Sequence, residues 1–313
     1  MLQLRRLVFA LAGSLALAAP ALAGKLAIVI DDFGYRPSTE NQVLAMPAEV
    51  SVAVLPNAPH AREMATKAHN QGHDVLIHLP MAPLSKQPLE KDTLRPDMNS
   101  EEIARIIREA VNDVPYAIGM NNHMGSAMTS SLPGMQKVMA ALAHYNLFFL
   151  DSMTIGNSQA MRAAAGTGVK VIKRKVFLDD TQNEADIRYQ FNRAVTLARR
   201  NGSAIAIGHP HPSTVRVLQQ MLYSLPPDIT LVRASSLLNE PQVDTSRPNA
   251  APPSQTAPAA PRNPFRGVKL CKPKRQPEPV YATRFFTVIS ESVSESAVVS
   301  YFRHQWQGWG KQS

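Results

Sequence analysis

Short apolar segments alternate with amphipathic segments along most of this sequence, and this alternation restricts the fold more than any other feature. The apolar segments are rich in Val, Ile and Leu and lack alternating polar residues, which is typical of strands buried on both faces. They are residues 26–30, 50–55, 75–79, 117–120, 147–150, 169–172, 204–207 and, more weakly, 229–232. The amphipathic segments predict helices at 59–71, 101–111, 135–145, 184–200 and 214–223.

A strand–helix repeat of this kind predicts an α/β fold with a parallel sheet, because consecutive parallel strands need a crossover connection. Ser100 is the expected N-cap of the second helix, and Gly202 is the expected end of the fourth. Seven or eight such units either close into a (β/α) barrel or stay open as a doubly wound sheet. In both architectures ligands bind beyond the carboxyl ends of the strands.

Acidic residues and histidines follow most of the apolar segments, where a parallel sheet would gather them at one rim. The candidates are Asp31, Asp32, His78, Asn122, His123, Asp151, His209 and His211. Two His and one Asp are a usual ligand set for a catalytic Zn²⁺. A further carboxylate can act as general base and a separate His as general acid, so the set predicts metal-assisted hydrolysis. Asp179 and Asp180, beyond the sixth segment, are expected to face the solvent.

Each candidate also has a structural interpretation. Asp31 and Asp32 are compatible with a turn or a helix N-cap, although two acids beside a buried strand need a compensating partner. His78 is compatible with a core histidine, and Asp151 with a cap of the segment that follows it. His211 stays open between a role in the site and none.

Several segments resemble motifs of polysaccharide deacetylases of the NodB type. Residues 30–34 are similar to the Asp-Asp-Gly motif that opens these enzymes, and residues 72–78 to a strand motif that ends on a metal-binding His. The segments that resemble a divergent branch of the family are 122–126, 149–152 and 208–210. The resemblance covers about residues 25–238 and implies a distorted (β/α) barrel of about seven parallel strands with a divalent metal at the strand ends.

The resemblance also implies roles for individual residues. Asp31 would be the catalytic base, Asp32 a metal ligand, His78 the first metal histidine and His209 the general acid. The standard family has its second metal His four residues after the first, and this sequence has Ala82 there. The family's Arg-Pro-Pro motif is also missing.

His123, beyond the next strand, is therefore the candidate for the third metal ligand. Asn122, Asp151 and His211 are expected to support the ligands or to contact the substrate, Asp151 by orienting an imidazole. The resulting hypothesis is a periplasmic hydrolase that uses Zn²⁺ or a similar ion to deacetylate a carbohydrate or another cell-envelope polymer. The alternative is a non-catalytic envelope protein that holds a glycan or peptide on a deacetylase scaffold.

The first 23 residues predict export. Arg5 and Arg6 precede an apolar run at 7–17 that is too short to span a bilayer comfortably. Ala21–Ala23 has the small-x-small pattern that signal peptidase recognises. We expect cleavage before Gly24, a periplasmic location and no later transmembrane segment; an uncleaved anchor is the alternative.

The composition changes after the predicted domain, residues 24–240. Residues 241–280 contain ten prolines, which predicts a disordered linker. Six basic residues and no acid lie in 262–275, so this linker is either a solvated tether or a contact for an anionic envelope component.

Residues 281–313 are too short for a domain and have no assigned role. The single Cys271 excludes an intramolecular disulfide. Because the net charge of +9 is concentrated in the linker and export separates the chain from nucleic acid, we expect no nucleic-acid partner.

Overall fold

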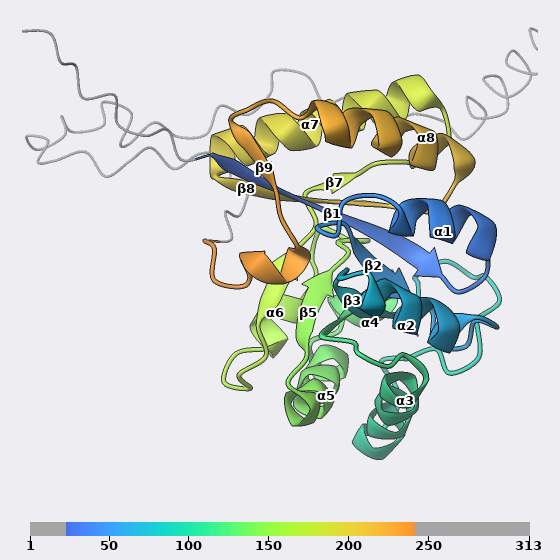
Figure 1. Ribbon diagram of the computed structural model, residues 1–313. Coiled ribbons are helices and arrows are strands. Elements are labelled where there is room, and N and C mark those ends of the chain that lie inside the picture. Colours follow the sequence, from blue (N-terminus) through green and yellow to red (C-terminus); the bar gives the residue numbers. More distant parts are fainter. Residues whose placement is uncertain (1–22, 242–313) are drawn as a thin grey trace, which may run out of the picture. The chain divides into compact units, whose positions relative to one another are not determined.

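Nine parallel strands form one sheet in the computed structural model, which describes residues 23–241 (Figure 1). The strands are β1 (Gly24–Phe33), β2 (Ser51–Val54), β3 (Val75–Met81), β4 (Gly119–Met124), β5 (Phe148–Asp151), β6 (Val171–Lys173), β7 (Val176–Phe177), β8 (Ser203–Gly208) and β9 (Ile229–Leu231). Eight of them follow the order β6-β5-β4-β3-β2-β1-β8-β7, and β9 pairs with the beginning of β1. Residues 1–22 and 242–313, with the expected linker, C-terminal segment and Cys271, lie outside the described residues.

The sheet curls until its two edges meet. β6 and β7 stand at opposite ends of the strand order, yet only Arg174 and Lys175 separate them. Arg174 N donates to Asp151 O of β5 (3.0 Å), and Lys175 N donates to Ile205 O of β8 (2.8 Å). Three peptide steps span at most about 11 Å, so the edges must lie close together at this crossover. The predicted distorted barrel is confirmed as a curled, eight-stranded half-barrel, with β9 added beside β1.

Helices cover the outside of this sheet. They are α1 (Pro37–Leu44), α2 (Ala61–Asn70), α3 (Ser100–Asp113), α4 (Ser126–Ser130), α5 (Leu132–Leu142), α6 (Ala160–Ala163), α7 (Glu184–Asn201) and α8 (Pro212–Met221), with the 3₁₀ turns η1 (Ala143–Tyr145), η2 (Leu222–Ser224) and η3 (Ala234–Leu237). Figure 1 shows α7 and α8 on one side of β1, and α2, α3 and α5 on the other. In α3 the buried residues Ile103, Ile106 and Ile107 recur at helical spacing, which places one apolar face on the strands.

The helix ends agree with the sequence prediction at α7 and differ from it at α3. Gly202 ends α7 with a φ of 81°, a left-handed conformation that glycine adopts without strain. The N-cap of α3 is Asn99 and not Ser100, because the Asn99 side chain accepts a hydrogen bond from Glu102 N (2.8 Å). Both residue types cap helices well, so composition did not separate them. The short elements α1, α4, α6 and β7 gave no periodic signal and were not predicted.

η3 closes the amino end of the curled sheet. Its residues Ala234 and Leu237 pack against inward-facing strand residues such as Val29. Ala234 N donates to Ser51 Oγ (3.1 Å), at the first residue of β2. The inside of the sheet is therefore filled from the amino end, and the carboxyl ends of the strands are left for a site.

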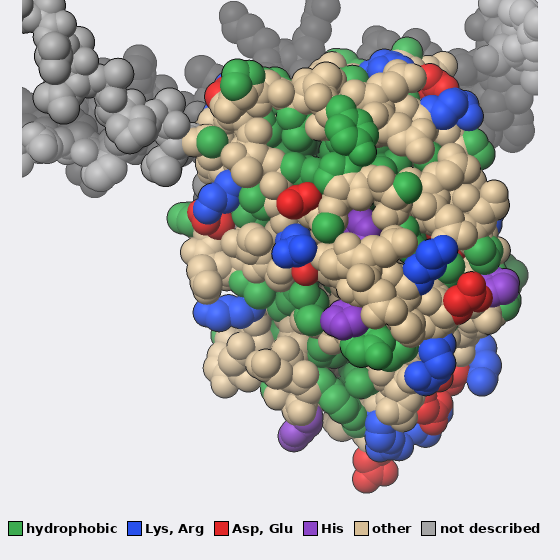
Figure 2. All heavy atoms as spheres, viewed as in Figure 1, with side chains coloured by type: hydrophobic (Ala, Val, Ile, Leu, Met, Phe, Trp, Pro, Cys, Tyr) green, Lys and Arg blue, Asp and Glu red, His purple; other side chains and the backbone are tan. Residues whose placement is uncertain are grey.

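The surface of the described domain is mixed. Figure 2 shows acidic and basic side chains interspersed over one face, with hydrophobic side chains scattered among them. Of the helices within residues 23–241, none combines the length and the apolar character needed to cross a membrane.

Candidate metal centre

A β-bulge in β1 brings two adjacent aspartates to the same rim. The pairing of β1 with β2 shifts between Ile30 and Phe33. Asp31 and Asp32 therefore stand opposite the single residue Ala53, where regular alternation would send them to opposite faces. Asp32 has a φ of 59°, a left-handed conformation that is costly for a non-glycine residue and is found at functional sites. The end of β1 is thus locally strained at the point where both carboxyl groups turn toward the same rim.

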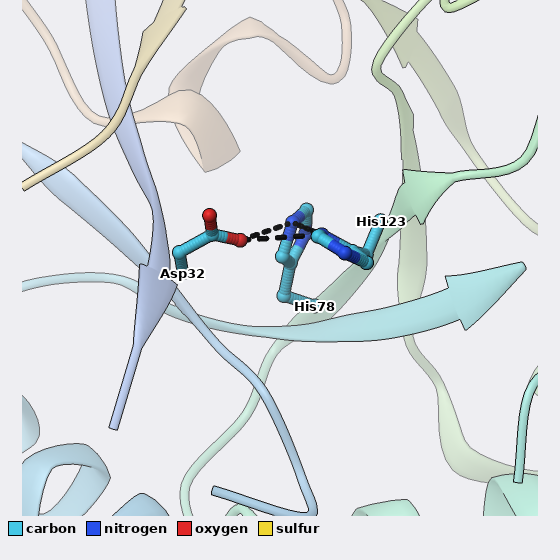
Figure 3. A group of neighbouring side chains, drawn as sticks. All are labelled: Asp32, His78 and His123. Atoms are coloured by element: carbon cyan, nitrogen blue, oxygen red, sulfur yellow. Dashed lines mark hydrogen bonds and ion pairs between the residues drawn. The ribbon is translucent and has the colours of Figure 1, made fainter. Parts of the chain in front are cut away.

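Asp32, His78 and His123 point toward one another from β1, β3 and β4 (Figure 3). Asp32 Oδ1 lies 3.3 Å from His78 Nε2 and 3.2 Å from His123 Nδ1, and the two nitrogens are 3.0 Å apart. His123 pairs in register with Pro80, two residues after His78, so both side chains lie on the same face of the sheet. We call these three residues the triad.

The triad fits a divalent ion. A tetrahedral ion with ligands at about 2.0–2.1 Å needs donor atoms about 3.3 Å apart, and the sides of the triad measure 3.0–3.3 Å. Asp32 Oδ1 is buried and accepts no hydrogen bond from the described residues. Only the two ring nitrogens of the triad face this oxygen. A buried carboxylate oxygen that accepts no hydrogen bond is costly, and a cation at the centre of the triad would remove that cost.

Asn121 orients one imidazole of the triad and also holds Asp31. His78 Nδ1 lies 2.8 Å from Asn121 Oδ1 and donates to it, which leaves Nε2 free to face the triad. Asn121 Nδ2 donates to Asp31 Oδ1 (2.8 Å). The residue predicted from the sequence was the neighbouring Asn122, whose side chain instead accepts from Ser152 N (2.9 Å) and ties β4 to the segment after β5. Because side chains alternate along β4, Asn121 lies on the same face as His123 and Asn122 lies on the other face.

Asp31 is a buried carboxyl group beside the triad. Its side chain is almost inaccessible, and its Oδ2 lies 3.7 Å from His78 Nε2. Burial raises the pKa of Asp31 above its ordinary value, against the opposing charges of His78 and His209. Burial acts on Asp32 as well, but its contacts with His123 and His78 hold its pKa below the usual range. These opposite pKa shifts suit a pair in which Asp32 stays ionised beside a cation and Asp31 exchanges a proton.

His209 faces the triad from the end of β8. Its Nε2 lies 3.9 Å from Asp32 Oδ2. Its Nδ1 lies 3.0 Å from Asp179 Oδ1, and Asp179 Oδ2 accepts from His209 N (2.7 Å) and from Thr214 Oγ1 (2.7 Å). Burial alone would lower the pKa of His209, but the hydrogen bond and charge of Asp179 raise this pKa to about 9.

The expectation that Asp179 faces the solvent is wrong. This side chain is buried because its carboxylate joins the end of β8 to the first turn of α8, whereas Asp180 is exposed as expected. Asp179 has no motif around it, so the sequence offered no signal for its contact with His209. Its position next to β8 depends on β7, the strand that was too short to predict.

Asp151 and His211 lie beside the site and outside the triad. Asp151 is fully buried, and its Oδ1 accepts from a backbone N–H. Within the described residues it makes no hydrogen bond to an imidazole, so the orienting role expected of it belongs to Asn121 and Asp179. The ring of His211 lies 5.6 Å from the ring of His209, centroid to centroid.

The triad opens into a pocket of about 210 Å³. The lining residues are Asp32, Tyr35, Arg36, Leu55, Glu90, His123, His209, Pro210 and His211. Glu90 comes from the segment between β3 and α3, and its Oε1 lies 3.3 Å from His123 Nε2. No recognisable spacing includes Glu90, Tyr35 or Arg36, so these residues were not predicted from the sequence.

Residues 28–238 match a family model described as divergent polysaccharide deacetylase. The chain belongs to this family. The resemblance noted in the sequence is thereby confirmed over residues 28–238. Membership of this family supports a deacetylase-type function on carbohydrate.

Two relatives and one solved structure are similar to this chain. The chain is 77% identical over 312 residues to the uncharacterised protein YibQ of Escherichia coli K12, across 100% of this chain and 97% of that protein. It is 47% identical over 224 residues to an uncharacterised protein of Haemophilus influenzae, across 72% and 80% of the two chains. The crystal structure of an uncharacterised protein from Agrobacterium tumefaciens C58 has the same fold, with a TM-score of 0.64 at 20% identity over 70% of this chain and 91% of that one.

Proposed function

We propose that this protein is a periplasmic, metal-dependent hydrolase that removes acetyl groups from an amide- or ester-linked carbohydrate. The observation that carries the proposal is the triad, flanked by the carboxyl group of Asp31 on one side and the imidazole of His209 on the other. We propose Zn²⁺ as the ion, because two imidazoles and one carboxylate are its usual catalytic ligand set.

The residues around the triad can move the protons that deacetylation requires. When bound by the triad, Zn²⁺ would acidify a water molecule and polarise the acetyl carbonyl. Asp31 accepts the proton of the attacking water, and its raised pKa makes it a stronger base. His209, held at Nδ1 by Asp179, is protonated at neutral pH and donates from Nε2 to the departing amine or alcohol.

A non-catalytic glycan- or peptide-binding protein is the competing proposal, because Ala82 stands where the standard family has a metal histidine. Two observations favour the enzyme. His123 reaches the triad from the neighbouring strand, so three donor atoms remain together. A buried Asp31 with a raised pKa is of use to a general base and of none to a binding protein.

Elemental analysis of the purified full chain tests the proposal. We expect about one Zn²⁺ per chain, lost in Asp32→Ala, His78→Ala and His123→Ala, because each removes one of three ligands. His60→Ala is the matched control, since this exposed histidine pairs with Glu63 away from the triad. The metal-loaded chain should release acetate from acetylated glycans. No metal in the wild type after reconstitution with Zn²⁺ would leave the binding protein as the better proposal.

The periplasmic location rests on the export signal expected in residues 1–23. The expected cleavage point coincides with the start of β1 at Gly24, so cleavage would leave the sheet intact. N-terminal sequencing of protein recovered from the periplasm should begin at Gly24. A full-length chain in the cytoplasm would contradict the location without affecting the metal site. An anionic partner for the linker remains a separate proposal.

A further inference from the structure

The turn after β1 holds two side chains on a fixed backbone. The N–H groups of Gly34, Tyr35 and Arg36 all donate to Glu40 Oε1, at 3.0, 3.0 and 2.6 Å. Glu40 is fully buried although it lies in the first turn of α1. Gly34 has a φ of 112°, and a Cβ there would lie 2.5 Å from Ala58 Cβ. Three charge-assisted hydrogen bonds and a position that only glycine fits make this a rigid turn.

This rigid turn places Tyr35 and Arg36 at the wall of the pocket that opens from the triad. Tyr35 is 51% exposed, and Arg36 is also exposed. Arg36 is the one Lys or Arg among the described residues that line this pocket. An aromatic ring and a cation are therefore fixed beside the candidate site and remain accessible to a ligand.

The guanidinium of Arg36 has no ion pair or hydrogen bond to any residue in the described range 23–241. Other arginines of the domain are paired: Arg105 contacts three carboxylates, and Arg199 binds Asp228. The carboxylates of the pocket itself face histidines, Asp32 in the triad and Glu90 at His123. No acid of the pocket is left to neutralise Arg36.

Arg36 lies on the His209 side of the pocket. It stands directly before α1, His211 stands directly before α8, and these two helices contact each other. The ring of His211 neighbours that of His209. In the proposed reaction the acetyl carbonyl lies at the triad and the leaving group lies at His209. A group that Arg36 binds therefore belongs to the sugar that departs, and not to the acetyl group.

We infer that the substrate is an acetylated sugar that carries an anionic group, a carboxylate or a phosphate, which Arg36 binds while Tyr35 packs against the sugar ring. A guanidinium group pairs with a carboxylate and with a phosphate alike, through two parallel hydrogen bonds. Arg36 therefore indicates that the substrate is anionic and does not distinguish these two groups. This inference rests on the proposed deacetylase function and specifies its substrate class.

Titration calorimetry on the Zn²⁺-loaded full chain tests the inference. The chain carries Asp31→Asn to prevent turnover, and the probes are N-acetylglucosamine, its phosphate ester and N-acetylmuramic acid, which bears a carboxylate. We expect at least one anionic sugar to bind about tenfold more tightly than the neutral sugar, because a hydrogen-bonded charge adds that much at a partly exposed site. Which anionic sugar binds more tightly tells the phosphate from the carboxylate.

Three added variants assign the preference to one side chain. Arg36→Ala should abolish it and leave the affinity for the neutral sugar unchanged, and Arg36→Lys should keep part of it. Arg108→Ala is the matched control, because Arg108 is an exposed arginine on α3 outside the pocket. Equal affinities for the three sugars, a preference that survives in Arg36→Ala, or no binding of any of the sugars would overturn the inference.

The failure of this inference is distinguishable from the failure of the proposed function. Zn²⁺ content and acetate release from a neutral aryl acetate test the hydrolase without involving Arg36. If the wild-type chain hydrolyses the neutral ester and shows no preference for anionic sugars, the proposed function holds and the inference about the substrate is wrong. If the chain neither binds Zn²⁺ nor hydrolyses the ester, both the proposed function and the inference are wrong.

Discussion

The two ends of the curled sheet are built from the same strands and differ in how their polar groups are satisfied. At the amino end η3 fills the opening with Ala234 and Leu237, and its backbone N–H groups have partners. At the carboxyl end Asp32 Oδ1 and Asp151 Oδ2 are buried and accept no hydrogen bond from residues 23–241, and His123 Nε2 faces only the carboxylate of Glu90, 3.3 Å away. The amino end therefore supplies stability, and the carboxyl end keeps reactive groups available at a cost in stability.

Asp31→Asn should have the largest effect and should act on chemistry alone. Turnover should fall about 10³-fold, because a general base contributes on that order. Stability should hold or rise, since the change removes a carboxyl group whose charge is costly to bury. Acetate release measures turnover, chemical denaturation measures stability and elemental analysis measures the metal. Loss of the metal together with turnover would make Asp31 a ligand and remove the division of roles between the two aspartates.

Leu237→Ala should have the opposite profile at the amino end. Leu237 is almost fully buried in η3, so its truncation should lower the free energy of unfolding by about 2–4 kcal/mol. Zn²⁺ content and turnover should not change below the unfolding transition. Leu84→Ala is the control, because Leu84 is 66% exposed and its loss should be nearly neutral. A Leu237→Ala chain that is folded but inactive would show that the two ends are coupled.

Glu90→Gln should weaken metal binding without unfolding the chain. The carboxylate of Glu90 lies 3.3 Å from His123 Nε2, on the side of the ring away from the triad, and such a partner makes the imidazole a better ligand. We expect about a tenfold loss of Zn²⁺ affinity in a chelator competition. Glu109→Gln, which removes a carboxylate that pairs with Arg105, is the control. An unchanged affinity would mean that Glu90 does not support His123.

Asp228→Asn should have the smallest effect, and it should depend on pH. The hydrogen bond and charge of Arg199 hold the pKa of Asp228 below its ordinary value. Because its folded-state pKa is lowered, Asp228 stabilises the protein at pH values above its unfolded-state pKa. This contribution is lost as the pH falls through the folded-state pKa. The variant should therefore have a slightly lower Tm at pH 7 and the wild-type Tm in strong acid. A difference that grows on acidification would contradict this sign.

The architecture was predictable because parallel strands buried on both faces leave uninterrupted apolar segments in the sequence. β1, β3 and β8 contain the predicted segments almost unchanged, and α7 ends at the glycine that marked its end. β7 was missed because its two residues are too few to form a pattern. Its importance lies in its place beside β8, which no local feature of the sequence reveals.

The sequence by itself determined that Asp32, His78 and His123 share one rim, because each follows or ends an apolar segment of a parallel sheet. The tertiary structure alone decided how these residues act. The bulge at Asp31 sets both aspartates on one face, and the pairing of β3 with β4 brings Asn121 beside His78. Asp179, Glu90 and Arg36 reach the site from connecting segments. Such contacts depend on distances between residues far apart in the chain, and no periodicity or spacing records them.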